Sequence, residues 1–227
     1  MVQKVEAEME QLRKETLDMW KLVYNQMQQA GESVLTLDKD LARQVILRER
    51  RVNAFELKID SDVEDVIALY NPVAVLLRFT LATLKINSNL ERIGDFADGM
   101  AHFVLDFKGP ALDPELVRKL QLTEMIDQVK AMLQTLFDAL EKENVDLAVR
   151  VFEMDKIVDE INHKSHPRLA EYILENPESN ALDALQLAGI FRKLERVGDH
   201  CTNMAEEIVF YLDAKVLKHQ GKTLSEK

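Results

Sequence analysis

The sequence predicts an all-α protein made of two tandem three-helix bundles related by internal duplication. Only seven glycines and five prolines occur in 227 residues, about half of ordinary usage, which argues against folds built from many short strands. Apolar residues recur at helical spacing, and no window alternates apolar and polar residues convincingly over six or more positions. A motif of the first half also recurs in the second half.

Several windows carry an apolar stripe at the ~100° per residue that is typical of an amphipathic helix. Between 38 and 60 the stripe consists of Leu41, Val45, Val52, Phe55 and Ile59. Arg48 interrupts this stripe once. Similar stripes run through 93–107 and 197–211. These windows therefore predict helices that each bury one face.

Turn and capping residues mark the ends of the first two predicted helices. Gly31 and the segment 36–38 end the first helix and cap the second. Asn71-Pro72 marks a boundary or a kink, because the residue before a proline is disfavoured in helical conformation.

The middle of the chain carries the next boundaries. Gly109-Pro110 breaks the helical pattern, and Asp113 followed by Pro114 is typical of an N-cap followed by the first helical residue. Asn144 separates two further helical patterns. A helix is therefore expected on each side of Asn144.

The last boundary lies at Asn176-Pro177 with Ser179. Pro167 predicts a kink within a helix, and the tail from Lys218 is polar and is expected to fray. Six helices are thus predicted, covering about 2–30, 38–60, 73–107, 114–142, 145–175 and 179–218.

Internal repetition divides the chain into two units. Leu-Glu-Arg-Ile-Gly-Asp at 90–95 recurs as Leu-Glu-Arg-Val-Gly-Asp at 194–199, and Asp-Leu-Ala at 40–42 recurs at 146–148. We therefore expect a first three-helix repeat over 1–109 and a second, with the polar tail, over 110–227. Three amphipathic helices can close a small bundle, and two bundles joined end to end would form an elongated molecule.

Composition limits the class of protein. With 47% apolar and 30% charged residues the chain is globular, and a net charge of −11 argues against nucleic acid or an anionic membrane surface as a partner. A single cysteine, Cys201, excludes an internal disulfide and fits a reducing compartment. The most apolar stretch, 72–86, is interrupted by Arg78 and Lys85, and no apolar signal region opens the chain. We expect a cytoplasmic protein that does not insert into membranes.

Acidic rows on the second and third helix of each repeat are the candidate metal ligands. Residues four apart share one helix face. The rows comprise Glu91 and Asp95, Glu195 and Asp199, Glu49 and Asn53, and Asp155 and Asp159. Oxygen donors of this kind suit Mg²⁺, Ca²⁺, Mn²⁺ or an iron ion.

Gly94 and Gly198 stand in the middle of helices beside these rows, at a cost of ~1 kcal/mol each relative to alanine. Close approach of the second helix of the same repeat would explain them, and the acidic rows would then converge and raise each other's pKa. Two other interpretations are open: the rows are solvated faces, or Arg92 and Arg196 pair with acids on adjacent helices. The repeated like-charged pairs and glycines argue against solvated faces, and the spacing alone divides evenly between a cation site and salt-bridge networks.

Other polar residues fit structural roles better. His163 and His166 are typical of a polar cluster at a kink, and His200 of a buried, hydrogen-bonded side chain. Cys201 and Trp20 are expected in the core. The phosphate-binding, dinucleotide, zinc-protease and serine-hydrolase motifs are absent from the sequence, so we expect no enzyme.

The duplicated Glu-Arg-[Ile/Val]-Gly-Asp motif resembles the signature of the PhoU family. The pairs Glu49-xxx-Asn53 and Asp155-xxx-Asp159 are similar to that family's second-helix motif, and 199–206 is similar to the stretch after its signature. The first repeat departs from this pattern, with Phe96, Gly99 and His102 at the positions of a histidine, an asparagine and an acid.

The resemblance implies a cytoplasmic, non-enzymatic negative regulator of phosphate uptake and of the phosphate-starvation response. It implies contact with the phosphate-specific ABC transporter and its sensor histidine kinase, and a homodimer. It also implies metal ions, such as Fe, Zn, Mg or Mn, on the acidic rows. The predicted ligands are Glu91, Asp95, Glu195, Asp199, Glu49, Asn53, Asp155 and Asp159.

Three alternatives stay open. One is a metal-binding or storage protein, and another is a metal-dependent hydrolase. The third is the PhoU-like cytoplasmic domain of a sodium–phosphate cotransporter, against which the Met1 start and the lack of a membrane segment speak.

Overall fold

A computed structural model describes residues 2–217, which form seven helices and no strand. The all-α prediction is therefore confirmed. The helices are α1 (Val2–Thr36), α2 (Lys39–Tyr70), α3 (Val75–Asp106), α4 (Pro114–Leu120), α5 (Leu122–Glu141), α6 (Val145–Glu175) and α7 (Pro177–Asp213).

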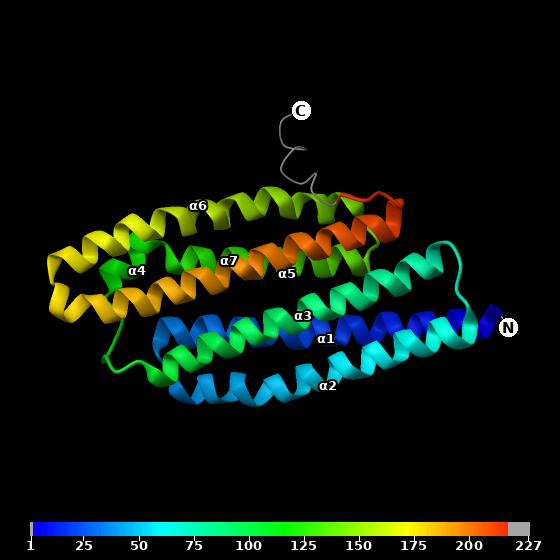
Figure 1. Ribbon diagram of the computed structural model, residues 1–227, viewed down its shortest axis with the longest axis horizontal. Coiled ribbons are helices and arrows are strands. Elements are labelled where there is room, and N and C mark those ends of the chain that lie inside the picture. Colours follow the sequence, from blue (N-terminus) through cyan, green and yellow to red (C-terminus); the bar gives the residue numbers. More distant parts are fainter. Residues whose placement is uncertain (1, 218–227) are drawn as a thin grey trace.

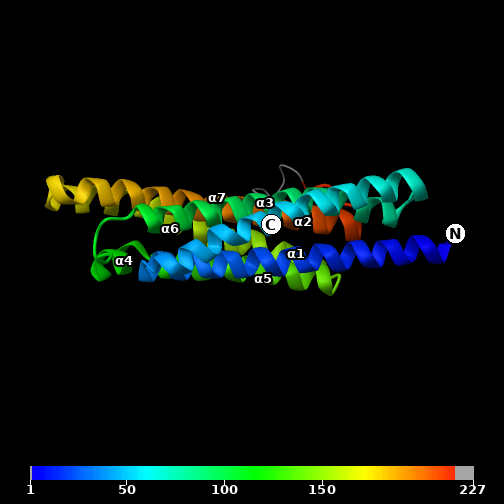
Figure 2. The same cartoon turned by 90° about the horizontal axis from the view of Figure 1, so that it is seen from below.

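The two repeats lie side by side along their long axes (Figures 1 and 2). Helices α1, α2 and α3 form one bundle, α5, α6 and α7 form the other, and α3 packs along α7 between them. The expected end-to-end joining is thus wrong. The reason is that α3 buries residues around much of its circumference, so it has one side for its own bundle and another for α7.

The ends of α2 follow from its caps and its apolar face. The side chain of Asp38 accepts hydrogen bonds from the backbone N–H groups of Asp40 and Leu41, both at 2.9 Å, and so caps the helix. The helix runs ten residues past its predicted end at 60, because the buried Val63 and Val66 continue the apolar face. It ends at Asn71 in the left-handed conformation with φ 46°, so Asn71 is a boundary.

The predicted helix over 114–142 is divided into α4 and α5, which is why seven helices replace the six predicted. Gln121 takes a left-handed conformation with φ 58° and separates the two. The expected cap of α4 is confirmed, since the backbone N–H of Glu115 donates to the side chain of Asp113 at 2.9 Å, ahead of Pro114.

In the second repeat α6 begins and ends as predicted, whereas α7 covers 177–213 in place of the predicted 179–218, because Ala214 takes a left-handed conformation with φ 57° and ends the helix. Asn144 caps α6 by accepting from the backbone N–H of Leu147 at 3.1 Å. Helix α6 contains Pro167 and continues to Glu175, and α7 starts at Pro177. The tail from Lys218, for which fraying was predicted, lies outside the described residues.

A continuous core joins the repeats. Trp20 is fully buried, as predicted, and donates from Nε1 to the backbone oxygen of Leu133 in the other repeat at 3.1 Å. Lys85 on α3 pairs with the buried Glu207 on α7 at 2.9 Å. Within residues 2–217, no helix combines the length and the apolar character of a membrane span.

Candidate metal centres

Each mid-helix glycine lies against the second helix of its own repeat. A Cβ atom built on Gly94 would stand 3.1 Å from Oε2 of Glu49 and 3.1 Å from Cγ1 of Val52 on α2. One built on Gly198 would stand 2.5 Å from Oδ1 of Asp155 on α6. The predicted close approach is therefore confirmed in both repeats, and it brings one acidic row beside the other.

Glu49 is a partly buried acid of the first repeat. Burial raises its pKa, and the nearby carboxylates of Asp95 and Asp98 on α3 raise it further. Gln26 on α1 opposes this rise by donating from Nε2 to Oε2 of Glu49 at 2.8 Å. Burial and Asp95 likewise raise the pKa of Asp98.

Glu91 belongs to the same cluster. Burial raises its pKa, and the carboxylates of Asp95, Glu56 and Glu49 add to the rise. Glu91 on α3 therefore interacts electrostatically with Glu56 and Glu49 on α2. Asn53 is exposed on α2.

The second repeat has a similar arrangement of acids on α6 and α7. Burial raises the pKa of Glu195, and Asp199 on the same helix and Asp159 on α6 raise it further. Asp155 lies close enough to Cys201 to add to the effect of burial, which raises the pKa of the thiol well above its ordinary value. Cys201 is buried as predicted and stays a protonated core residue at neutral pH.

The arginines of the signature pair with acids on their own helices. Nη1 of Arg92 lies 3.2 Å from Oδ2 of Asp95, and Nη1 of Arg196 lies 3.4 Å from Oδ2 of Asp199. The charge of Arg92 also opposes the rise in the pKa of Glu56 on the adjacent helix α2. Both arginine side chains are more than half exposed, and residues three apart on one helix reach each other readily. Such exposed pairs do not neutralise the half-buried Glu49.

Gln26 is a residue of this site that the sequence analysis missed. It is fully buried, and its amide holds one oxygen of Glu49. The other oxygen of Glu49, Oε1, is buried without a hydrogen-bond partner, as is Oε1 of Gln26. A glutamine among the apolar residues Val23, Met27 and Ala30 is the sequence signal that could have pointed to it.

The residues of the first repeat fit a cation in their chemistry. Glu49 offers an oxygen that lacks a partner, the neighbouring acids repel one another, and the carboxylates supply the oxygen ligands that hard cations prefer. As the side chains of residues 2–217 stand, no three His, Cys, Asp or Glu are arranged to hold one ion. Binding would therefore require the rows on α2 and α3 to close around it.

His200 takes the structural role that was predicted. Its Nδ1 lies 2.7 Å from Oδ1 of Asn89, and its ring stands 5.6 Å from that of Phe96 at the contact between α3 and α7. Burial and the charges of Arg196 and Arg92 lower its pKa to about 4. His166 contacts the backbone oxygen of Asn162 at 2.9 Å, next to Pro167.

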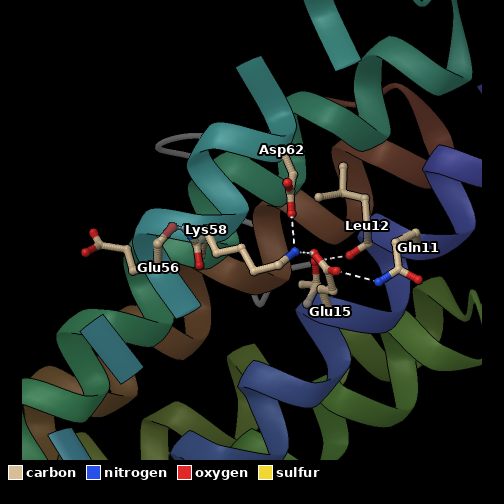
Figure 3. A network of polar contacts seen from close by, with 8 residues as sticks. Gln11, Leu12, Glu15, Glu56, Lys58 and Asp62 are labelled. Carbon is tan, nitrogen blue, oxygen red and sulfur yellow. Dashed lines mark hydrogen bonds and ion pairs between the residues drawn. The ribbon is translucent and has the colours of Figure 1, made fainter. Parts of the chain in front are cut away.

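A separate ionic network joins α1 to α2 (Figure 3). Nζ of Lys58 lies 2.6 Å from Oε2 of Glu15 and 2.6 Å from Oδ2 of Asp62, and Gln11 donates to Glu15. Burial and Glu15 raise the pKa of Asp62, whereas hydrogen bonds with Asp62, Lys58 and Gln11 outweigh burial and lower that of Glu15. Figure 3 shows Glu56 turned away from this network. The network therefore holds the two helices together without using the acidic row.

Two fused three-helix repeats, each with acids where its second and third helices meet, define a class of duplicated helical-bundle proteins. The family model described as PhoU domain matches the chain twice, over residues 16–104 and 122–208. The chain belongs to the PhoU family.

Individual relatives are similar in sequence to this chain over nearly its whole length. The chain is 32% identical to "Phosphate-specific transport system accessory protein PhoU homolog 1" of Thermotoga maritima, over 94% of this chain and 90% of that one. It is 33% identical to the accessory protein PhoU of Escherichia coli K12, over 95% and 88%. The crystal structure of PhoU from Pseudomonas aeruginosa superposes with a TM-score of 0.87 at 30% identity, covering 92% of this chain and 99% of that one.

Proposed function

We propose that this chain is an accessory protein of a phosphate transport system that restrains phosphate uptake and the phosphate-starvation response. The observation that carries the proposal is its 33% identity, over 95% of its length, to a protein named as an accessory protein of a phosphate-specific transport system. The relatives that it matches are named accessory proteins rather than enzymes. A non-enzymatic role also fits the sequence, which has none of the catalytic motifs considered above.

In this proposal the chain acts in the cytoplasm by contact. Its helical surface would bind the phosphate-specific ABC transporter and the sensor histidine kinase, and two copies would form a homodimer. Long helices packed side by side present continuous faces that suit such contacts. The name of the relatives, which places them with a transport system, supports the transporter as a partner.

The acidic rows would hold metal ions in support of this role. The proposed ligands are Glu49, Asn53, Glu91 and Asp95 in the first repeat, and Asp155, Asp159, Glu195 and Asp199 in the second. A bound cation supplies positive charge between carboxylates that otherwise repel each other. The buried oxygen of Glu49 and the close approach at both glycines support the assignment.

A gene deletion tests the regulatory role. In the source organism, loss of this gene should raise the output of a phosphate-starvation promoter in phosphate-rich medium, and a wild-type copy should restore repression. Affinity purification of the restored chain should recover the transporter and the kinase together with it. Unchanged promoter output in the deletion strain would overturn the proposal, whatever the metal content of the protein.

A further inference from the structure

A polar cleft of about 570 Å³ lies between α1 and α2 and is not part of the acidic rows. Helix α2 contributes two arginines to its lining, and α1 contributes amides and acids. The lining residues that matter here are Arg48, Arg51, Asn25, Gln28, Asp18 and Glu32. The size is that of a site for a small molecule or ion.

The two arginines of the cleft lack carboxylate partners. Within the described chain no ion pair joins Arg48 or Arg51 to an acid, whereas Arg43 and Arg118 each pair with an acid three residues away. Burial and the charge of Arg51 lower the pKa of Arg48. Arg48 also interrupts the apolar stripe of α2, so a partly buried cation stands where a packing residue is expected.

Such an arrangement is unfavourable without an anion. Like charges three or four residues apart on a helix repel each other, and a partly buried charge without a partner loses hydration. Both costs fall when an anion binds between the two guanidinium groups. The planar guanidinium fork matches the paired oxygens of a phosphate or carboxylate group.

We propose that this cleft binds a hydrogen phosphate group, either free phosphate or the phosphate of a small monoester, through the guanidinium groups of Arg48 and Arg51. The amides of Asn25 and Gln28, which line the same cleft, supply further donors. The site rests on the cleft alone and requires no metal on the acidic rows.

The acids of the cleft select among anions. Asp18 and Glu32 repel an anion that has no proton to share, such as sulfate. Inorganic hydrogen phosphate at neutral pH, and a phosphate monoester below its second pKa of about 6, carry a P–OH group, which can donate to one of these carboxylates while the other oxygens accept from the arginines. The same mixture of donors and acceptors therefore favours hydrogen phosphate over sulfate.

Calorimetric titration of the full chain in excess chelator tests the site without contribution from bound metal. Inorganic phosphate, ribose 5-phosphate and sulfate are titrated in turn at low ionic strength and at a pH below about 6, where both phosphates keep a P–OH group. We expect phosphate or ribose 5-phosphate to bind at least about tenfold more tightly than sulfate. Binding of inorganic phosphate alone identifies the free ion, and binding of ribose 5-phosphate alone identifies a monoester.

Variants decide whether the arginines hold the ligand. The double variant Arg48→Gln/Arg51→Gln should lose at least about tenfold in affinity, while Arg43→Gln/Arg118→Gln, which removes two arginines that already have partners, should bind as the wild type does. Without ligand, the first variant should melt no lower than the wild type, since two repelling charges are gone. No binding to the wild type, equal binding of sulfate, or undiminished binding by the first double variant would each overturn the proposal.

Discussion

Gly198 on α7 and Asp155 on α6 are in direct contact: a Cβ atom on the glycine would stand 2.5 Å from Oδ1 of the aspartate. The structure gives this glycine no positive φ, so its backbone does not require it. Glycine is required here because the carboxylate of Asp155 occupies the space that a side chain would need. The same relationship joins Gly94 to Glu49 in the first repeat, with a looser distance of 3.1 Å.

Substitution of Gly198 and of Gly189 by alanine distinguishes the effect of helix propensity on stability from the effect of the contact with Asp155. Gly189, on the same helix, has no atom within 4 Å of the position that a Cβ would take. Gly189→Ala should therefore raise the free energy of unfolding by about 1 kcal/mol through propensity alone. Gly198→Ala should not show this gain, because the new methyl group must displace Asp155. Urea denaturation of both variants measures the difference, and an equal gain in both would show that the contact costs nothing.

The ionised form of Glu49 should destabilise the metal-free fold. Burial and neighbouring acids raise its pKa above the ordinary 4.5, so the folded state takes up the proton at higher pH than the unfolded chain. Its contribution to stability is therefore present at low pH and is lost as the pH rises through the folded pKa.

Glu49→Gln should thus flatten the pH dependence in the window above 4.5, and it should gain stability relative to the wild type near neutral pH. Urea denaturation in chelator across this window provides the measurement. Glu153→Gln serves as a control, because its carboxylate is an exposed partner of Lys156. A wild type whose stability relative to Glu49→Gln increases with rising pH would disagree with the assignment.

Arg13 should contribute strongly to holding the two repeats together. Its guanidinium donates to the backbone oxygen of Leu140 at 3.2 Å and to the hydroxyl of Tyr211 at 2.6 Å, and it pairs with Glu143. The side chain is only 19% exposed. Arg13→Ala should therefore lower the free energy of unfolding by about 2 kcal/mol, since charged hydrogen bonds are lost and partners are left unsatisfied.

The control for this variant is Arg43→Ala. Arg43 is 59% exposed and, among the described residues, pairs with the exposed Asp40 alone, so its removal should cost less than about 0.5 kcal/mol. Chemical denaturation compares the two, and equal losses would show that the contact between the repeats contributes no more than a surface pair.

His200 should stay neutral in the folded protein well below the ordinary pH range of histidine. Its pKa of about 4 lies below the ordinary 6.5, so between these values the unfolded chain binds a proton that the folded one does not. The free energy of unfolding therefore decreases as the pH falls through this window, because protonation stabilises the unfolded chain. Nuclear magnetic resonance of the ring nitrogens should show Nδ1 protonated toward Asn89 and a midpoint near 4. A midpoint at 6.5 or above would refute the burial argument.

Local signals in the sequence were enough to predict much of the fold. Asp38, Asp113 and Asn144 cap their helices because a short polar side chain reaches the free backbone N–H groups of the next turn. Gly94 and Gly198 could be interpreted because each breaks helix propensity at the same place in a repeat. Such features depend on a few neighbouring residues and are visible in the sequence.

Other features depend on contacts between distant segments. Gln121 adopts a left-handed conformation, although glutamine is not one of the residue types that predict this conformation from the sequence. Gln26 on α1 donates a hydrogen bond to Glu49 on α2. Lys85 on α3 pairs with Glu207 on α7 only because the repeats lie side by side. The sequence contains these residues but not the packing that brings them together.

The metal content of the protein tests the central claim, that the duplicated acidic rows converge to hold cations. After dialysis against Mn²⁺, bound metal is counted for the wild type, for Glu91→Ala/Asp95→Ala, for Glu195→Ala/Asp199→Ala, and for the exposed control Asp40→Ala/Asp127→Ala. We predict that each row variant loses the ions of its own repeat and keeps those of the other, while the control keeps all. A wild type that binds no metal, or row variants with undiminished metal, would contradict the claim.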